Sequence, residues 1–268
     1  MKQALKHISY SLIQQGLSVP NVGLLHGKIG IVIFLFHYAR FSRDKLFEDS
    51  AIILMNSLLN ENKQRLVVNY ANGLAGIGVG VEYLVKNKFI ELNTNEVLNY
   101  FDKRIFYHTV CGGRKDLSLF TGLSGLGRYL LFRVSKDDHI STLNNKMLLI
   151  HITDTLERIY SSLEDADTED VLRFLYGMNQ TNIYPVKVKR LITLFSSHTP
   201  SSNQNKIMYQ YRIKHEALYH RRYNDFLSEI QENKQSCMVP DLYGGLAGIG
   251  LYLLSQLDNQ HETWMKLL

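Results

Sequence analysis

The chain has 268 residues, of which 45% are hydrophobic and 21% are charged, and its formal net charge is +5. This composition is ordinary for a soluble protein, and the length suits one large repeat domain or two small ones. The longest apolar run, Ile29 to Phe36, is far shorter than the roughly 20 residues that span a bilayer, so we expect no membrane segment.

In chain order, the predicted elements are helices that follow a recurring glycine motif. The first glycines stand at 27, 73, 122 and 245, and the intervals of 46 and 49 residues fit a two-helix repeat. The last interval is long enough for two or three units, and we expect a degenerate copy at Leu175-Tyr176-Gly177. The motif reads Gly-Leu-x-Gly-x-Gly at 73–78, 122–127 and 245–250, with a looser copy at 27–31. Apolar helices are predicted over Ile31 to Ala39, Val79 to Val85, Tyr129 to Val134 and Leu251 to Leu257.

Other segments have the period of amphipathic helices. One predicted face consists of Phe47, Ala51, Leu54, Met55 and Leu58, and a second of Leu148, Ile152, Leu156, Ile159 and Leu163. Strand signals are sparse. The contrast between amphipathic and apolar helices predicts an all-α fold in two layers, with the apolar helices enclosed.

The glycines indicate where a site would form. A helix that opens with Gly-x-x-Gly lacks Cβ atoms on one face of its first turn, so neighbouring backbone can approach it closely. Helix N-termini that converge on one cavity would favour anions or polarised carbonyl groups. Asn72 and Thr121 could instead be helix N-caps. The candidate substrate-binding residues before the glycines are Asn69, Tyr70, Asn72, Asp116, Thr121, Asp241 and Tyr243.

Among the residues that directly precede a motif glycine, His26 is the one suited to proton transfer near neutral pH. It is therefore the candidate catalytic residue. A structural histidine is the alternative.

Two further features bear on location and partners. The N-terminus lacks the continuous apolar core of a signal peptide, and we expect a cytoplasmic protein with Cys111 and Cys237 reduced. Between 187 and 222 stand eight Lys or Arg and one acid, Glu216. This basic segment could hold an acidic peptide or a polyanion, or form an ordinary solvated face.

The glycine copies, together with Gly23-Leu24-Leu25-His26-Gly27, resemble the repeat signature of the lanthionine synthetase C (LanC-like) family. The resemblance covers about half of the chain, roughly residues 20 to 135 and 238 to 258. It implies an α/α toroid, a double-layered helical barrel built from helical-hairpin repeats, forming a single domain over 1–268. The chain is short for a complete toroid, and 136–240 is its most divergent part.

The family's chemistry is the zinc-assisted addition of a peptide cysteine to a dehydroamino acid, with a histidine that handles the proton. Its zinc ligands are a cysteine two residues before one repeat glycine, and a Cys-His pair before the next. Here the corresponding positions hold Leu25, Ala71, Phe120 and Tyr243, each followed by His26, Asn72, Thr121 or Gly244. Only His26 matches, so we expect no metal and no other cofactor.

The sequence therefore predicts a LanC-like protein that acts in the maturation of a ribosomally made peptide without the zinc site. Whether it is an enzyme stays open. The expected partner is a precursor or leader peptide, bound through the segment 187–222, and a partner modification enzyme is also conceivable. The alternatives are a carbohydrate-active α/α-toroid enzyme, for which Asp116, Asp241 and Glu82 are the nearby acids, and a non-catalytic helical-repeat binding module. Nucleic-acid binding is not expected, because no nucleic-acid motif accompanies the basic segment.

Overall fold

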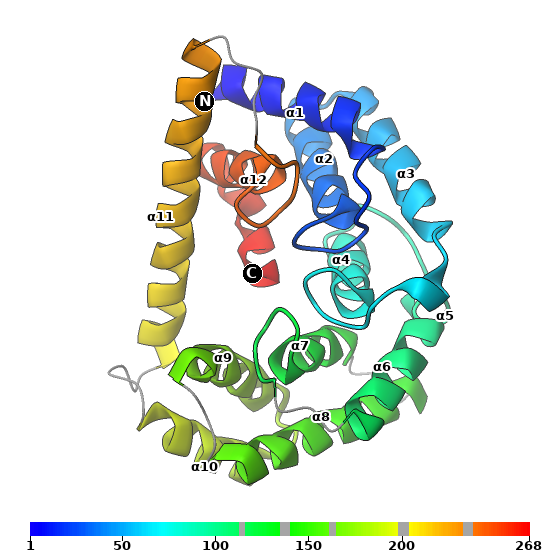
Figure 1. Cartoon of the computed structure of the whole chain (residues 1–268), viewed down its shortest axis with the longest axis vertical. Coiled ribbons are helices and arrows are strands. Elements are labelled where there is room, and N and C mark those ends of the chain that lie inside the picture. Colours follow the sequence, from blue (N-terminus) through cyan, green and yellow to red (C-terminus); the bar gives the residue numbers. More distant parts are fainter. Residues whose placement is uncertain (113–115, 135–139, 161–164, 198–203, 233–237) are drawn as a thin grey trace. The chain divides into compact units, whose positions relative to one another are not determined.

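The computed structural model describes residues 1–112, 116–134, 140–160, 165–197, 204–232 and 238–268. Within these residues every regular element is a helix and there is no strand, which confirms the all-α prediction (Figure 1). None of these helices is long and apolar enough to cross a membrane. The chain divides into two compact units: unit 1 comprises Met1–Leu66 and Arg212–Leu268, and unit 2 comprises Val67–Tyr211.

Unit 1 is built around α2, an apolar helix that lies between α3 and α12 (Figure 1). Every residue of α2 from Lys28 to Tyr38 is buried, as expected for an enclosed helix. The buried face of α3 consists of the five residues predicted from Phe47 to Leu58. The elements of the unit are α1 (Lys2–Gly16), α2 (Lys28–Ser42), α3 (Lys45–Leu59), η1 (Lys63–Arg65), α12 (Leu246–Leu257), η3 (Asn259–Leu267) and residues 212–231 of α11 (Gln204–Gln231).

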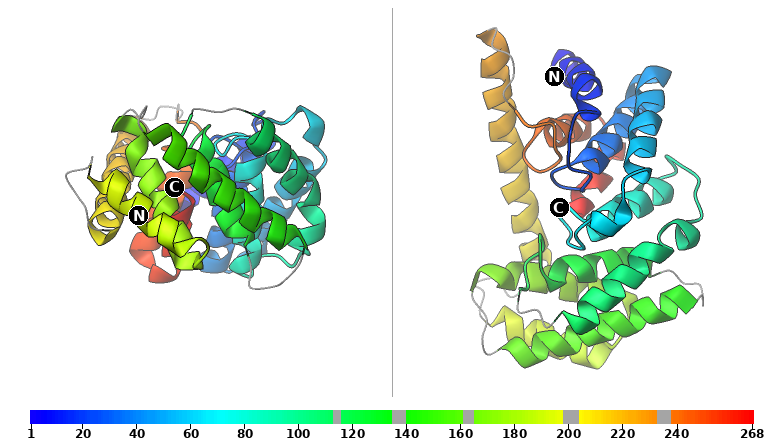
Figure 2. Two further views of the ribbon diagram at one scale, coloured as in Figure 1. Left: turned by 90° about the horizontal axis from the view of Figure 1, so that it is seen from below. Right: turned by 45° about the vertical axis from the view of Figure 1, so that its right-hand side comes forward.

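Unit 2 is organised around α7, which packs against α4, α8 and α9. α8 packs against α7, and α10 packs against α9. Figure 2 shows α8 and α10 side by side. Leu148, Ile152 and Leu156 are buried as predicted, whereas Leu163 lies outside the described residues. The helices are α4 (Leu74–Lys86), α5 (Thr94–Val97), α6 (Asn99–Cys111), α7 (Leu123–Arg133), α8 (Ile140–Ile159), α9 (Asp165–Thr181) and α10 (Pro185–Ser196).

The first glycine of every motif copy is the N-cap of the helix that follows it. Gly27, Gly73, Gly122 and Gly245 all have extended backbone and make no side-chain cap bond. The alternative role of Asn72 and Thr121 as N-caps is therefore wrong, because each stands one residue before the capping glycine. A glycine is required at these positions, since a Cβ on Gly73 would lie 2.2 Å from the carbonyl oxygen of Val67.

In the three copies that have a third glycine, this glycine leaves room for an aromatic ring of a neighbouring helix. A Cβ on Gly78 would lie 2.4 Å from the ring of Tyr129, and one on Gly250 would lie 2.2 Å from Phe34. Tyr129 and Phe34 each stand seven residues after the first glycine of their own copy. Successive apolar helices, α4 with α7 and α12 with α2, thus pack in the same register.

This register locates the degenerate copy. Gly127 faces the ring of Phe174 in α9. If Phe174 also stands seven residues after the start of a copy, that copy starts at 167, which is 45 residues after Gly122. The expectation of a copy at Gly177 is wrong, because Gly177 lies in the C-terminal half of α9. Asp170 then occupies the place of the second glycine.

The loops before the glycines are joined to one another by backbone hydrogen bonds in a repeated pattern. The N–H groups of Tyr70 and Ala71 both donate to the carbonyl of Phe120, at 3.1 and 3.0 Å. In unit 1, Leu242 and Tyr243 donate in the same way to Leu25, at 3.1 and 2.9 Å. The last copy is therefore bonded to the first, although their bonded residues are more than 200 positions apart in the sequence.

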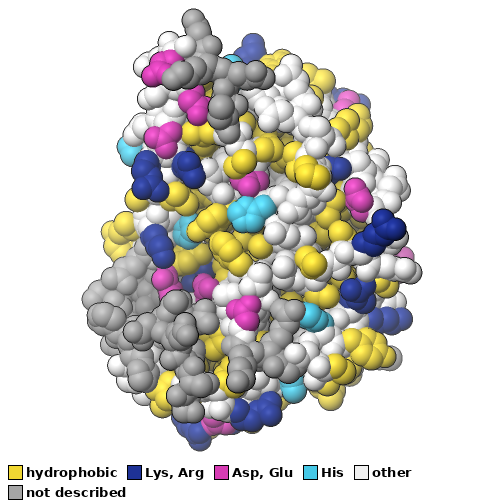
Figure 3. Space-filling view, viewed as in Figure 1, with side chains coloured by type: hydrophobic (Ala, Val, Ile, Leu, Met, Phe, Trp, Pro, Cys, Tyr) yellow, Lys and Arg dark blue, Asp and Glu magenta, His cyan; other side chains and the backbone are white. Residues whose placement is uncertain are grey.

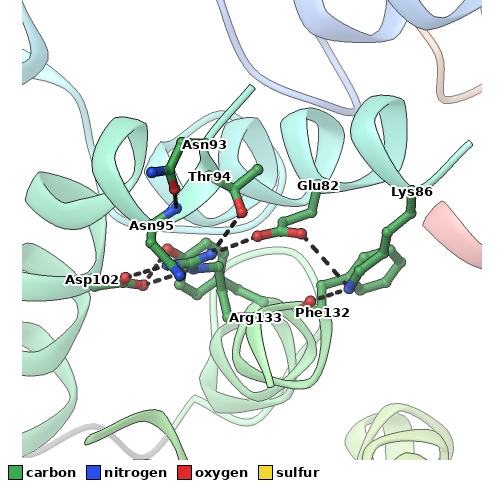
Figure 4. A network of polar contacts seen from close by, with 9 residues as sticks. Glu82, Lys86, Asn93, Thr94, Asn95, Asp102, Phe132 and Arg133 are labelled. Carbon is green, nitrogen blue, oxygen red and sulfur yellow. Dashed lines mark hydrogen bonds and ion pairs between the residues drawn. The ribbon is translucent and has the colours of Figure 1, made fainter. Parts of the chain in front are cut away.

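A buried arginine ties four helices of unit 2 together (Figure 4). The Arg133 side chain is 2% exposed and donates to Glu82 at 2.5 Å and to Asp102 at 2.8 Å. It also donates to Thr94 and Asn95 of α5. Although burial opposes its charge, the hydrogen bonds to Asp102 raise the pKa of Arg133 above its ordinary value. Arg133 therefore stays charged and links α4, α5, α6 and α7.

Candidate functional site

His26 and Asp241 form the candidate functional site in unit 1. His26 directly precedes the capping Gly27 of α2, and Asp241 belongs to the loop before α12. The bonds from Leu242 and Tyr243 to Leu25 align the two loops. As a result, Nδ1 of His26 lies 3.0 Å from Oδ2 of Asp241.

The exposure of the pair is suited to proton transfer. The His26 side chain is 35% exposed, whereas that of Asp241 is 13% exposed. A carboxylate bonded to Nδ1 fixes the tautomer and orientation of the imidazole, and Nε2 is then the atom at which a ligand would exchange a proton. Oδ1 of Asp241 is buried without a hydrogen-bond partner among the described residues. The carboxylate is thus directed at the histidine.

One aromatic ring packs against this pair, and a buried histidine packs against that ring. The ring of Tyr243 packs edge-on against His26, with 5.9 Å between their centroids. On its other side Tyr243 meets His215 of α11 in the same arrangement, also at 5.9 Å. His215 is 3% exposed. Of the predicted site residues, the structure therefore brings His26, Asp241 and Tyr243 together.

The remaining predicted site residues lie in unit 2. Several of them form hydrogen bonds within the loop to which they belong. Thr121 donates to Oδ2 of Asp116 at 2.6 Å, and Oδ1 of Asp116 accepts from the N–H of Ser118 at 2.9 Å. Asn69 accepts from the N–H of Asn72 at 2.9 Å. These contacts are those of a tightly folded loop.

Tyr70 differs from the other residues of this group. Its side chain is completely buried, so it does not line an open rim. Burial is the main reason why its pKa is raised, and the charges of Arg128 and Arg173 oppose that shift. Tyr70 is therefore a neutral phenol in the interior of unit 2.

The three acids considered for glycoside hydrolysis are all engaged by other groups. Asp241 contacts His26, Glu82 contacts Arg133, and Asp116 accepts from Thr121. Glycoside hydrolysis requires a carboxylic acid and a carboxylate on either side of the scissile bond. None of these contacts provides such a pair within the residues that the structure describes.

Several cations of the basic segment 187–222 form ion pairs with acidic side chains. Lys187 and Arg190 of α10 form ion pairs with Glu157 of α8, and Arg212 pairs with Glu216. The exposed cations that this segment contributes to unit 1 are on α11, over which Lys and Arg side chains gather in Figure 3. They include Lys214, Arg221 and Arg222.

A structural or catalytic metal ion needs at least three protein ligands close together. In the described part of the chain, no group of three His, Cys, Asp or Glu side chains is close enough to hold an ion. Cys111 is an exposed free thiol at the end of α6. Cys237 lies outside the described residues.

Comparisons with family models, with curated proteins and with solved structures found no match to this chain. The site must therefore be interpreted from its own geometry.

Sequence reasoning missed His215, Arg128 and Arg173. His215 has no motif around it, and only the packing of α11 places it beside Tyr243. Arg128 and Arg173 did leave a signal. They are 45 residues apart, which matches the repeat length, and each stands six residues after the start of its copy.

Proposed function

We propose that this chain is a LanC-like protein that binds a ribosomally made peptide and transfers a proton at it through His26, without a zinc centre. The α/α toroid expected of such a protein is supported by the shared register of the apolar helices in each unit. That register includes the pairing of the last copy with the first.

The observation that carries the proposal is the contact of 3.0 Å between His26 and Asp241. A thiol that adds to a dehydroamino acid must lose a proton, and the resulting enolate must gain one. A histidine that is held by a carboxylate and partly exposed is suited to both steps. Tyr243, packed against the imidazole, limits its rotation.

The helix ends beside this pair favour the same chemistry. α2 begins directly after Gly27 and α12 directly after Gly245. The N-terminus of a helix carries about half a positive charge, and such charge stabilises an enolate oxygen. The motif glycines thus bring two positive helix ends close to His26.

The residues present do not fit the family's zinc site. Its three ligands would stand one or two residues before the motif glycines, where this chain offers a single histidine. Zinc would lower the pKa of the peptide thiol, so a protein without zinc must rely on His26 for that step. Metal analysis of the purified protein is the direct check, and stoichiometric zinc would contradict this part of the proposal.

The proposal can be tested with a dehydrated ribosomal peptide that contains cysteine together with dehydroalanine or dehydrobutyrine. Ring closure changes no mass, so the reaction is followed by the loss of thiols that react with N-ethylmaleimide. We expect His26→Gln to slow thiol loss by about 10²- to 10⁴-fold and to retain peptide binding. His220→Gln, on the exposed side of α11, is the matched control. Equal rates for the wild type, both variants and a protein-free control would leave only a binding module.

A further inference from the structure

A cavity lies between α1 and α11 in unit 1. Its volume is about 590 Å³, within the range of roughly 300–1,000 Å³ that is usual for ligand-binding clefts. The two helices meet at His7, whose ring packs edge-on against the buried Phe226 with 5.9 Å between their centroids. Figure 1 shows the N-terminal end of α1 beside the C-terminal part of α11. Neither His26 nor Asp241 lines the cavity, so it is distinct from the site described above.

The two walls of the cavity differ in polarity. α11 contributes Tyr223, Leu227 and Ile230, which stand at i, i+4 and i+7 and are half-buried. Residues with this spacing lie on one face of a helix, where they commonly pack against another apolar surface. Here they face a mostly polar wall across the cavity, so a fitting ligand has both an apolar and a polar side. The polar side chains that α1 contributes are those of Gln3, Lys6, His7, Tyr10, Ser11 and Gln14.

The basic groups of the polar wall favour an anionic ligand. Lys6 and His7 line the cavity, and among the described residues no Asp or Glu does so. α1 contains no acidic residue over its whole length. The acids in the adjoining part of α11 do not line the cavity, and they are Asp225, Glu229 and Glu232. A carboxylate that entered the cavity would therefore lie beside a cation and away from these acids.

α11 connects this cavity to the candidate site around His26. His215 of α11 packs against Tyr243, which itself packs against His26. Tyr223 lines the cavity and stands eight residues after His215, which is slightly more than two helical turns and about 12 Å along the helix. About four residues of extended chain cover that distance. One peptide could thus occupy the cavity and reach His26.

We propose that the cavity between α1 and α11 binds an acidic segment of the peptide on which His26 acts. Apolar side chains of this segment contact Leu227 and Ile230, and a neighbouring carboxylate lies beside Lys6 and His7. The inference rests on the proposed function, because it assigns a second part of the same peptide to a second place in unit 1. Binding there raises the effective concentration of the reacting cysteine at His26.

The first test measures binding of two sets of fluorescently labelled ten-residue peptides, in which Leu and Phe alternate with either Glu or Lys. Fluorescence anisotropy with the whole chain gives the dissociation constants. We expect the Glu peptides to bind at least about tenfold more tightly than the Lys peptides, and their binding to weaken as salt is added, because salt screens exposed charges. Equal binding of the two sets, or no binding of either, overturns the proposal.

Lys6→Glu shows whether the peptides bind in the cavity. The substitution reverses a charge of the lining at an exposed position of α1, where it does not disturb the core. We expect it to weaken binding of the Glu peptides about tenfold or more. Lys103→Glu, exposed on α6, changes the net charge equally and should leave the dissociation constant within about twofold. Equal losses in the two variants indicate non-specific attraction and overturn the proposal.

A second copy of this chain is the other occupant to consider. Analytical ultracentrifugation of the wild type and of Lys6→Glu decides this point. We expect the two proteins to have the same oligomeric state. If the wild type forms a dimer that Lys6→Glu dissociates, the cavity is an interface between copies and the proposal is overturned.

The thiol assay separates this inference from the proposed function. With the dehydrated peptide, Lys6→Glu should lower kcat/KM about tenfold through KM, whereas His26→Gln lowers it through kcat. If the Glu peptides bind in the cavity and the protein causes no thiol loss, the cavity stands and the proposed function fails. If thiols are lost and the KM of Lys6→Glu equals that of the wild type, the proposed function stands and the cavity proposal is overturned.

Discussion

The ring of Tyr129 fills the space that a side chain on Gly78 would need. A Cβ there would lie 2.4 Å from the ring, and Tyr129 cannot swing away freely because its hydroxyl donates to Asp102 at 2.6 Å. We expect Gly78→Ala to lower the free energy of unfolding by about 1–3 kcal/mol, as overpacking does. Urea unfolding followed by circular dichroism measures this.

Gly177→Ala is the control for that substitution. Its Cβ would meet the end of the Leu131 side chain, which can move aside. We expect the free energy of unfolding to change by about 0.5 kcal/mol or less. Equal losses in both variants would show that helical glycines in this chain are not distinguished by their neighbours.

Arg133→Met should be among the most destabilising single substitutions in unit 2. It would leave Glu82 and Asp102 without their shared cation, and breaking a buried ion pair in this way costs about 3–5 kcal/mol. Arg190→Met breaks an exposed pair with Glu157, which solvent screens, and should cost much less stability. Denaturant unfolding of the two variants gives the comparison, and a small loss for Arg133→Met would contradict the role drawn in Figure 4.

Stability should fall at alkaline pH because of Tyr129. Burial, together with the charge of Asp102, raises the pKa of this phenol well above its ordinary value. From about pH 10 upward the unfolded chain loses the phenolic proton while the folded chain keeps it. The free energy of unfolding therefore decreases as pH rises through that window and is unaffected below it. Urea unfolding between about pH 8 and 11 should give a flatter profile for Tyr129→Phe.

Asp241→Asn tests whether the carboxylate acts through His26. An amide of the same shape keeps the loop in place but removes the charge that orients the imidazole. We expect thiol loss in the dehydrated peptide to slow about 10²-fold or more, with peptide binding unchanged. A rate equal to that of the wild type would show that His26 works without Asp241.

Much of the helical framework could be predicted from the sequence, because its causes are local. The motif glycines predicted the start of four apolar helices, and the period of α3 predicted its buried face from Phe47 to Leu58. The copy in α9 was misplaced for an equally local reason. Asp167 and Asp170 stand where the first two glycines would be, so the visible Gly177 was misleading.

The site was only partly predictable. His26, Asp241 and Tyr243 were each chosen from their position beside a motif glycine, but their meeting depends on α12 packing against α2. No local pattern records that contact. Arg173 and Arg128 likewise become neighbours through packing, although their separation in the sequence matches the repeat length and could be seen there.

The bond between Leu25 and Leu242 also has a consequence for the order of events during synthesis. Unit 2 is continuous in sequence, whereas unit 1 is assembled from both ends of the described chain. A ribosome that has made α1, α2 and α3 must still add all of unit 2, α11 and α12 before α2 can pack against α12. The face of α2 that packs against α12 is apolar and stays exposed until α12 is made. Contacts between segments that are far apart in the sequence form slowly, and exposed apolar surface promotes aggregation in the meantime. We expect nascent chains that stop before α12 to need chaperones, and unit 2 to acquire protease resistance first.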